Sequence, residues 1–238
     1  MADIMSAIFL PVFFNMKDMT LGLVLDQLTS VSKTALFALL VLVTVLITYI
    51  GQEVLIPDRL YYEFYSSQLS IDRIDKIIEL KDKWSWISYV ILPFVYLIKF
   101  SVIAIWILVC MVFQGYKTSF RKLMSVVILS EFVFIIPPMM RLIWFGLIQT
   151  DFSLSEFQLF NPLSLANFFD VGELELWWRY PLQSFNLFEL IYTAVLSIGL
   201  SIVFKIKLME SLQFMFPTYF LGLLIWIVFV SFLTLNIS

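Results

Sequence analysis

The chain has 238 residues, of which 61% are hydrophobic and 14% are charged, and its formal net charge is −3. A soluble domain is ~45–50% apolar, so this composition excludes a soluble domain and indicates a membrane protein. The chain has no histidine and one cysteine, Cys110, which excludes an internal disulfide and the usual zinc, haem and iron–sulfur sites. We therefore expect no metal and no cofactor. The acidic balance and the lack of a basic stripe also argue against nucleic-acid binding.

Residues 1–33 are predicted to form a cytoplasmic amphipathic segment. Short apolar groups such as Ile8-Phe9-Leu10 are interrupted by Pro11, Asn15 and Lys17, so the segment is too broken to span a bilayer. Such a segment lies in the membrane interface or docks on a partner protein.

Residues 34–238 are predicted to form a membrane domain built on five apolar runs. A hydrocarbon core of ~30 Å requires ~20 mostly apolar helical residues, with ~17 as the practical minimum. The expected fold is all-α, a polytopic bundle with five transmembrane helices at residues 34–50, 86–113, 123–148, 187–204 and 212–235.

The first outer loop, residues 51–85, contains a predicted amphipathic helix from Ser70 to Lys83. Its isoleucines recur every three to four residues, which places them on one helix face. This stripe packs against the protein's own body or the bilayer surface, or it contacts a partner subunit. The partner-contact candidates are Ile71, Ile74, Ile77 and Ile78.

Two opposite charges fall near the middle of the second and third runs, Lys99 and Glu131. Both runs meet at the connection 114–122, so their helices are expected to be antiparallel neighbours. A lysine stem spans the remaining offset between the two levels, and we predict a Lys99–Glu131 ion pair. The pair either neutralises two costly charges or forms part of a proton or substrate pathway.

A second pair is predicted near the outer edge of the membrane. Arg141 lies late in the third run and is expected to extend to the outer headgroups. Glu189, early in the fourth run, lies at the same level and is its candidate partner.

Helix breakers mark the third and later runs. Pro137 and Pro138 remove two helix donors and predict a kink in the third span. Gly199, Pro217 and Gly222 predict bends or close helix contacts in the last two spans, where small residues permit tight packing.

The distribution of basic residues predicts the orientation. The connection 114–122 has Lys117, Arg121 and Lys122 without an acid, and the connection after the fourth run has Lys205 and Lys207. The loop 149–186 is acidic and aromatic. The positive-inside rule places the amino end in the cytoplasm, and the loops 51–85 and 149–186 and the carboxyl end outside. Within the second loop, Asn161-Pro162 predicts a break, with a short interfacial helix over 163–169.

Several kinds of catalysis are excluded. No aspartate lies in any of the five runs, which argues against an intramembrane aspartyl protease, and the lack of histidine rules out any nucleophile–histidine pair. No phosphate-binding Gly-x-x-x-x-Gly-Lys loop is present. We therefore predict that the chain is not an enzyme.

The order of elements resembles the Yip (Ypt/Rab-interacting protein) family, including its bacterial five-span members. The resemblance covers roughly residues 20–235. It is most specific in the segments Gln114-Gly115-Tyr116-Lys117-Thr118-Ser119-Phe120-Arg121-Lys122, Asn161-Pro162-Leu163-Ser164-Leu165, Phe185-Asn186-Leu187-Phe188-Glu189-Leu190-Ile191-Tyr192, Ile198-Gly199-Leu200 and Lys205-Ile206-Lys207.

The resemblance implies a membrane scaffold or accessory subunit without catalytic residues. Bacterial relatives are found alongside ABC-type exporters, which implies a bacterial inner-membrane location and an exporter permease, a homo-oligomer or other integral membrane proteins as partners, besides membrane lipids. The alternative function is a small transporter or channel subunit that uses the intramembrane charges Lys99 and Glu131.

Overall fold

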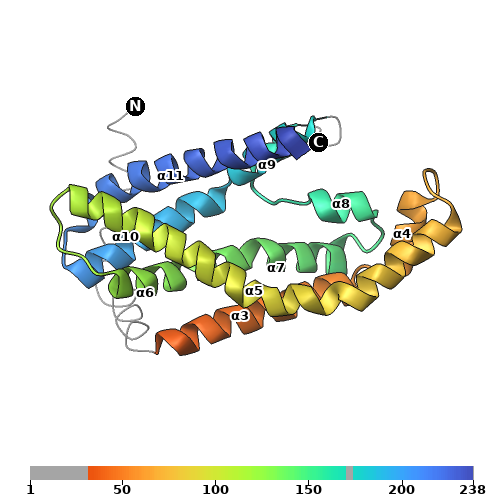
Figure 1. Cartoon of the computed structure of the whole chain (residues 1–238), viewed down its shortest axis with the longest axis horizontal. Coiled ribbons are helices and arrows are strands. Elements are labelled where there is room, and N and C mark those ends of the chain that lie inside the picture. Colours follow the sequence, from red (N-terminus) through yellow and green to blue (C-terminus); the bar gives the residue numbers. More distant parts are fainter. Residues whose placement is uncertain (1–31, 170–173, 238) are drawn as a thin grey trace.

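The computed structural model describes residues 32–169 and 174–237, and this part of the chain is all-α. The predicted segment 1–33 therefore lies outside the described residues except at its last two positions. The helices run side by side along the long axis of the molecule (Figure 1). In chain order they are α3 (Lys33–Tyr49), η1 (Ile50–Val54), α4 (Asp58–Tyr65), α5 (Ile71–Phe113), α6 (Phe120–Ser130), η2 (Glu131–Ile135), α7 (Ile136–Ile143), η3 (Trp144–Ile148), α8 (Leu154–Leu159), η4 (Leu165–Phe168), α9 (Leu176–Ser184), α10 (Leu187–Phe204) and α11 (Leu208–Ile237).

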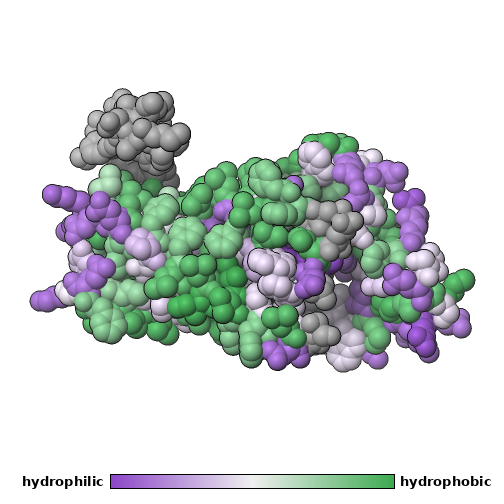
Figure 2. Space-filling view, turned by 90° about the horizontal axis from the view of Figure 1, so that it is seen from above, coloured by the Kyte–Doolittle hydropathy of each residue, from purple (hydrophilic) through white to green (hydrophobic). Residues whose placement is uncertain are grey.

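Within residues 32–169 and 174–237, five helical segments are long and apolar enough to cross a membrane, and each contains one predicted run. They are Lys33–Val54, Ile71–Phe113, Phe120–Ile148, Leu187–Phe204 and Leu208–Asn236. Figure 2 shows a broad hydrophobic belt between hydrophilic residues at the two ends of the molecule. Large apolar side chains such as Leu42, Phe94 and Val228 are exposed on this belt. This surface fits lipid contact and confirms the predicted fold class.

The second span is longer than predicted. The expected loop helix over 70–83 and the expected span over 86–113 form one helix, α5, of 43 residues. At ~1.5 Å per residue it is about 65 Å long, roughly twice the hydrocarbon thickness. The two segments fuse because no proline or glycine separates Lys83 from Trp86.

The isoleucine stripe is largely covered by the chain itself. Ile74 is 1% exposed and Ile78 is 8% exposed, whereas Ile77 is half-buried and Ile71 is exposed. The short helix α4 packs against this part of α5, and the Tyr62 hydroxyl donates to Asp75 Oδ1 over 2.5 Å. The prediction of a partner contact is therefore wrong for Ile74 and Ile78, because α4 folds back over them.

The third span changes helix type just before its two prolines, and the predicted kink itself stays a prediction. α6 gives way to a 3₁₀ segment, η2, before α7 begins at Ile136. Pro137 and Pro138 occupy the first turn of α7, where missing donors cost little. The change of helix type therefore precedes the prolines instead of following them, because the carbonyls that their N–H groups would bond lie in η2.

Most of the core lies where α3, α5, α6 and α10 meet. Its fully buried members include Leu40, Phe100, Leu123 and Leu196. A second apolar cluster lies under α4 and α8 at the other end of the molecule (Figure 1) and consists of Ile56, Leu60, Phe145, Leu154 and Phe157.

The two predicted sets of connections lie at opposite ends of the bundle (Figure 1). At one end, Lys33 Nζ donates to Arg121 O over 2.9 Å and the Tyr116 hydroxyl donates to Glu210 Oε1 over 2.5 Å. This second hydrogen bond raises the pKa of Tyr116. The connections after α5 and α10 therefore share one end, which is the arrangement that the basic residues predicted.

The long loop is joined to the start of α10. Leu165 N–H donates to Phe185 O over 2.9 Å, and Leu187 N–H donates to Leu163 O over 3.0 Å. These bonds form an isolated antiparallel bridge between Ser164 and Asn186. The predicted helix over 163–169 is shorter, a 3₁₀ turn at Leu165–Phe168.

The start of α8 is fixed by a capping box. Ser153 Oγ accepts from the Glu156 N–H over 3.2 Å, and the Ser153 N–H donates to Glu156 Oε2 over 2.7 Å. The hydrogen bonds that the Ser153 N–H and then the Ser153 hydroxyl donate to the Glu156 carboxylate hold the pKa of Glu156 below its usual range. A depressed folded-state pKa contributes stability above the unfolded pKa, ~4.3, and this contribution is lost as the pH falls through the folded value.

We expect Ser153→Ala to lower the local stability of α8 by about 1 kcal/mol, because one helix N–H loses its acceptor. Hydrogen exchange of the amides in Leu154–Leu159 measures this loss. Wild-type protection should also fall as the pH drops below ~4, and this pH dependence should be absent in Glu156→Gln. Ser66→Ala, at the exposed end of α4, is the control; equal protection in both serine variants would contradict the role of the box.

Candidate functional site: a buried polar cluster

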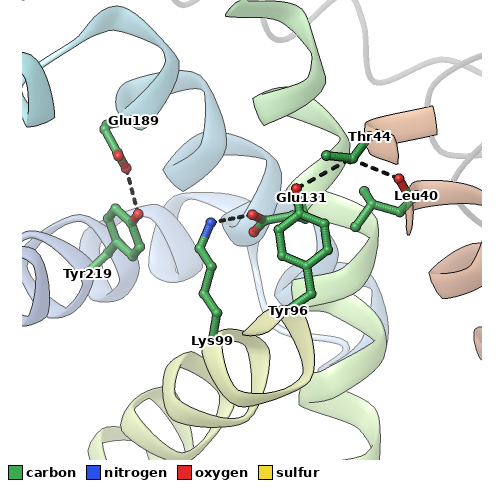
Figure 3. Close-up of polar contacts among 7 residues, drawn as sticks. All are labelled: Leu40, Thr44, Tyr96, Lys99, Glu131, Glu189 and Tyr219. Atoms are coloured by element: carbon green, nitrogen blue, oxygen red, sulfur yellow. Dashed lines mark hydrogen bonds and ion pairs between the residues drawn. The ribbon is translucent and has the colours of Figure 1, made fainter. Parts of the chain in front are cut away.

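The predicted Lys99–Glu131 ion pair is present in the structure. Lys99 Nζ, on α5, donates to Glu131 Oε1, on η2 (Figure 3). The Glu131 side chain is 2% exposed and that of Lys99 is 41% exposed. A buried carboxylate is thus neutralised by a lysine that enters from the bundle surface.

The helix geometry explains why these two residues meet. Lys99 is about 21 Å from the end of α5 at Phe113, and Glu131 is about 17 Å from the start of α6 at Phe120. α5 and α6 pack against each other and are antiparallel, so both residues reach nearly the same level. The next residue along α5, Phe100, is fully buried and anchors that part of the helix in the core.

An aromatic ring lies beside the lysine. Lys99 Nζ is 4.7 Å from the centroid of the Phe134 ring, within the range of a cation–π contact. The Phe134 ring in turn packs against Tyr192, with centroids 4.8 Å apart. The ammonium group therefore has a carboxylate and a ring as neighbours.

Glu189 pairs with a tyrosine, not with Arg141. The Tyr219 hydroxyl, on α11, donates to Glu189 Oε2 over 2.6 Å (Figure 3). Glu189 is also close enough to Lys99 and Glu131 to interact with both electrostatically. The cluster therefore holds two carboxylates and one ammonium group.

The predicted Arg141–Glu189 pair is wrong. Arg141 Nη2 donates to Phe160 O over 2.8 Å, and its guanidinium lies 5.5 Å from the Phe157 ring centroid. The segment around α8 folds back against α7 and takes up the arginine, whereas Glu189 faces α11. The two residues also lie at different levels, because Arg141 is about 32 Å along its span from Phe120, whereas Glu189 is about 23 Å along its span from Phe204.

Sequence reasoning missed two tyrosines of the cluster. Tyr192 is fully buried, and its ring centroid lies 5.2 Å from that of Tyr219. Tyr192 follows Glu189 by three residues, which places both on one face of α10, so helical spacing was an available signal. Tyr219 offered no such signal, because aromatic residues are common in apolar spans.

Two polar atoms of the cluster lack a hydrogen-bond partner among the described residues. They are Glu131 Oε2 and the Tyr192 hydroxyl. Buried polar atoms without partners are uncommon in native proteins. The cluster thus has unused capacity to accept or donate a hydrogen bond.

The cluster reaches α3 through one further contact. The Tyr96 hydroxyl donates to Thr44 Oγ1 over 3.3 Å, and the Thr44 hydroxyl donates to Leu40 O over 2.9 Å (Figure 3). Tyr96 precedes Lys99 by one helical turn. Polar contacts near one level therefore involve α3, α5, η2, α10 and α11.

The side-chain chemistry of this cluster is charge neutralisation and hydrogen bonding. In the described part of the chain, no group of three or more histidine, cysteine, aspartate or glutamate residues is placed to hold a metal ion. Cys110, on α5, is a half-buried free thiol that packs against the main apolar core.

The part of the chain that the structure describes is all-α, and five of its helical segments are long and apolar enough for a multi-pass membrane protein. Comparisons with protein-family models, with curated proteins and with solved structures found no match.

Proposed function

We propose that the chain is a non-enzymatic integral membrane scaffold or accessory subunit that packs against other membrane proteins. The observation that carries this proposal is the buried Lys99–Glu131 pair, which joins α5 to η2 within one chain. A paired charge of this kind favours a defined helix arrangement over free movement of the helices. The Glu189–Tyr219 hydrogen bond supports the same reading for α10 and α11.

The outer surface of α11 supports a packing role. Leu221, Leu224, Val228 and Phe232 are exposed and recur every three to four residues along this helix. They form one apolar seam that is open to lipid or to the helix of another membrane protein. An ABC-type exporter permease is the candidate partner that the Yip resemblance supplies, and a second copy of the chain is the other.

The orientation belongs to the same proposal. In this proposal the protein lies in a bacterial inner membrane. The end that carries Lys117, Arg121 and Lys122 faces the cytoplasm, and the end formed by α4 and α8 faces the opposite side of the membrane. Labelling of a cysteine placed at Lys117 or at Ser66 with an impermeant maleimide tests this assignment, in a Cys110→Ala background.

A transporter or channel subunit is the second candidate. The observation in its favour is that a second carboxylate, Glu189, lies close enough to the Lys99–Glu131 pair to interact with it electrostatically, while Glu131 Oε2 and the Tyr192 hydroxyl are unpaired among the described residues. Intramembrane carboxylates of this kind are typical of proton relays.

A photocrosslinking amino acid at Val228, which is 67% exposed, separates the two candidates. If the chain is an accessory subunit, irradiation of native membranes should give one dominant adduct with another membrane protein, recovered in a fixed ratio. The same crosslinker at buried Leu196 is the control and should give none.

Proton flux in liposomes is the second measurement. An accessory subunit should give no flux above that of empty liposomes. A purified chain that forms no adduct and conducts protons, with the flux lost in Glu189→Gln and kept in Glu79→Gln, would overturn the scaffold proposal.

A further inference from the structure

A cavity of about 560 Å³ is lined by residues of α3, α4, α5, α7 and α8, among others. Figure 1 shows that these helices come together at the end of the molecule that carries α4. The cavity has a size within the ~300–1,000 Å³ typical of small-molecule sites. It is separate from the polar cluster, because none of Lys99, Glu131 and Glu189 lines it.

The charge of the cavity wall has one sign. Arg141 and Lys81 line it, and no aspartate or glutamate is among the lining residues in the described part of the chain. Lys81 Nζ forms ion pairs with Asp58 over 3.8 Å and with Asp82 over 3.5 Å, and both of these carboxylates are exposed and lie outside the lining. Lys81 is thus partly neutralised from outside the cavity, and Arg141 is the principal cation of the wall.

Arg141 has a spare donor. Its Nη2 donates to Phe160 O, but its buried Nε–H has no acceptor among the described residues. A buried donor without a partner is destabilising, and more so when it is charged. An anionic oxygen bound in the cavity would supply the missing acceptor.

The rest of the wall is amphipathic. Thr48, Gln52 and Ser85 provide hydroxyl and amide groups, and Ile47 and Leu142 provide apolar surface. Such a wall matches a ligand with a polar head and an apolar body.

The depth of the cavity matches the edge of the bilayer. Gln52 is about 29 Å along the first span from Lys33, and Arg141 is about 32 Å from Phe120. Both distances are close to the ~30 Å thickness of the hydrocarbon core, so the cavity opens at headgroup level.

We propose that this cavity binds the phosphate-bearing headgroup of an anionic phospholipid. The phosphate lies between Arg141 and Lys81, and the glycerol and first acyl carbons pack on Ile47 and Leu142. Basic pockets between membrane helices are suited to lipid headgroups for these physical reasons. The proposal is independent of the scaffold function.

Native mass spectrometry of the purified full chain tests the site. With phosphatidylglycerol we expect one retained lipid per chain, and with phosphatidylcholine at least tenfold weaker retention. Arg141→Gln should weaken phosphatidylglycerol retention at least tenfold. Arg59→Gln, which removes an exposed cation at the same end outside the cavity, should leave retention unchanged.

Two further measurements distinguish loss of the site from misfolding, and a lipid from a soluble phosphate ligand. Ser85→Phe fills the cavity but keeps both cations, so it should also abolish retention while the protein still elutes as one species. Inorganic phosphate and glycerol phosphate at millimolar concentrations should not displace the lipid. Displacement by either would overturn the lipid assignment, and equal retention in wild type, Arg141→Gln and Ser85→Phe would overturn the site.

Discussion

Glu131→Gln should lower the free energy of unfolding by about 3–5 kcal/mol, because it leaves the Lys99 ammonium without its carboxylate in an apolar span. Lys99→Met should also destabilise the fold, because it leaves Glu131 buried and unpaired. The double variant should be more stable than either single variant, since neither charge then remains. Unfolding in a detergent–denaturant titration measures all three.

The matched controls lie on the exposed outer part of α5, where Lys76→Met and Glu79→Gln should each change stability by less than about 0.5 kcal/mol. The double-mutant cycle also bears on function. A scaffold should regain its crosslinked partner in the Lys99→Met/Glu131→Gln variant. Loss of proton flux in a double variant that is as stable as wild type would instead support the transport pathway.

Gly199→Ala should destabilise the contact between α6 and α10 by ~1–3 kcal/mol through overpacking. A Cβ at this position would lie 2.6 Å from Val126 Cγ1, closer than carbon atoms approach in folded proteins. The same unfolding titration measures the loss.

The neighbouring valine allows a direct check of this cause. Val126→Ala removes the clashing methyl group, so the Gly199→Ala/Val126→Ala variant should be more stable than the sum of the two single effects. Gly146→Ala is the control, because its Cβ would be 3.8 Å from the nearest side-chain atom, an ordinary contact. Additive effects in the Gly199/Val126 pair would show that the clash is not the cause.

The sequence predicted the spans and the levels of Lys99 and Glu131, because length and hydropathy determine both. Lys99 and Glu131 meet since they lie on adjacent antiparallel helices at nearly one level. The same reasoning failed for Arg141 and Glu189. Arg141 is about 32 Å from Phe120 and Glu189 about 23 Å from Phe204, so the two do not lie at one level. The segment after α8 supplies a nearer partner for the arginine, the Phe160 carbonyl.

The contacts of short connecting helices such as α4 also could not be predicted from the sequence. The isoleucine stripe correctly indicated a buried face, but only the fold shows that α4 covers Ile74. The cavity beside Arg141 was missed for a similar reason, since its wall comes from helices far apart in the chain. Periodicity describes one helix at a time and carries no information on spaces between several.

The length of α5 has a mechanical consequence. Pro93 lies within this helix and removes one backbone hydrogen bond, so it is the weakest point against bending. Ile71 is about 33 Å from Pro93, whereas Lys99 is only about 9 Å beyond it. A tilt of ~10° at Pro93 would therefore swing the outer tip of the helix by ~6 Å and leave the Lys99 side nearly still. α5 is thus hinged near its middle: the inner half is anchored in the core by residues such as Phe100 and Ile107, and bending at Pro93 moves the outer half.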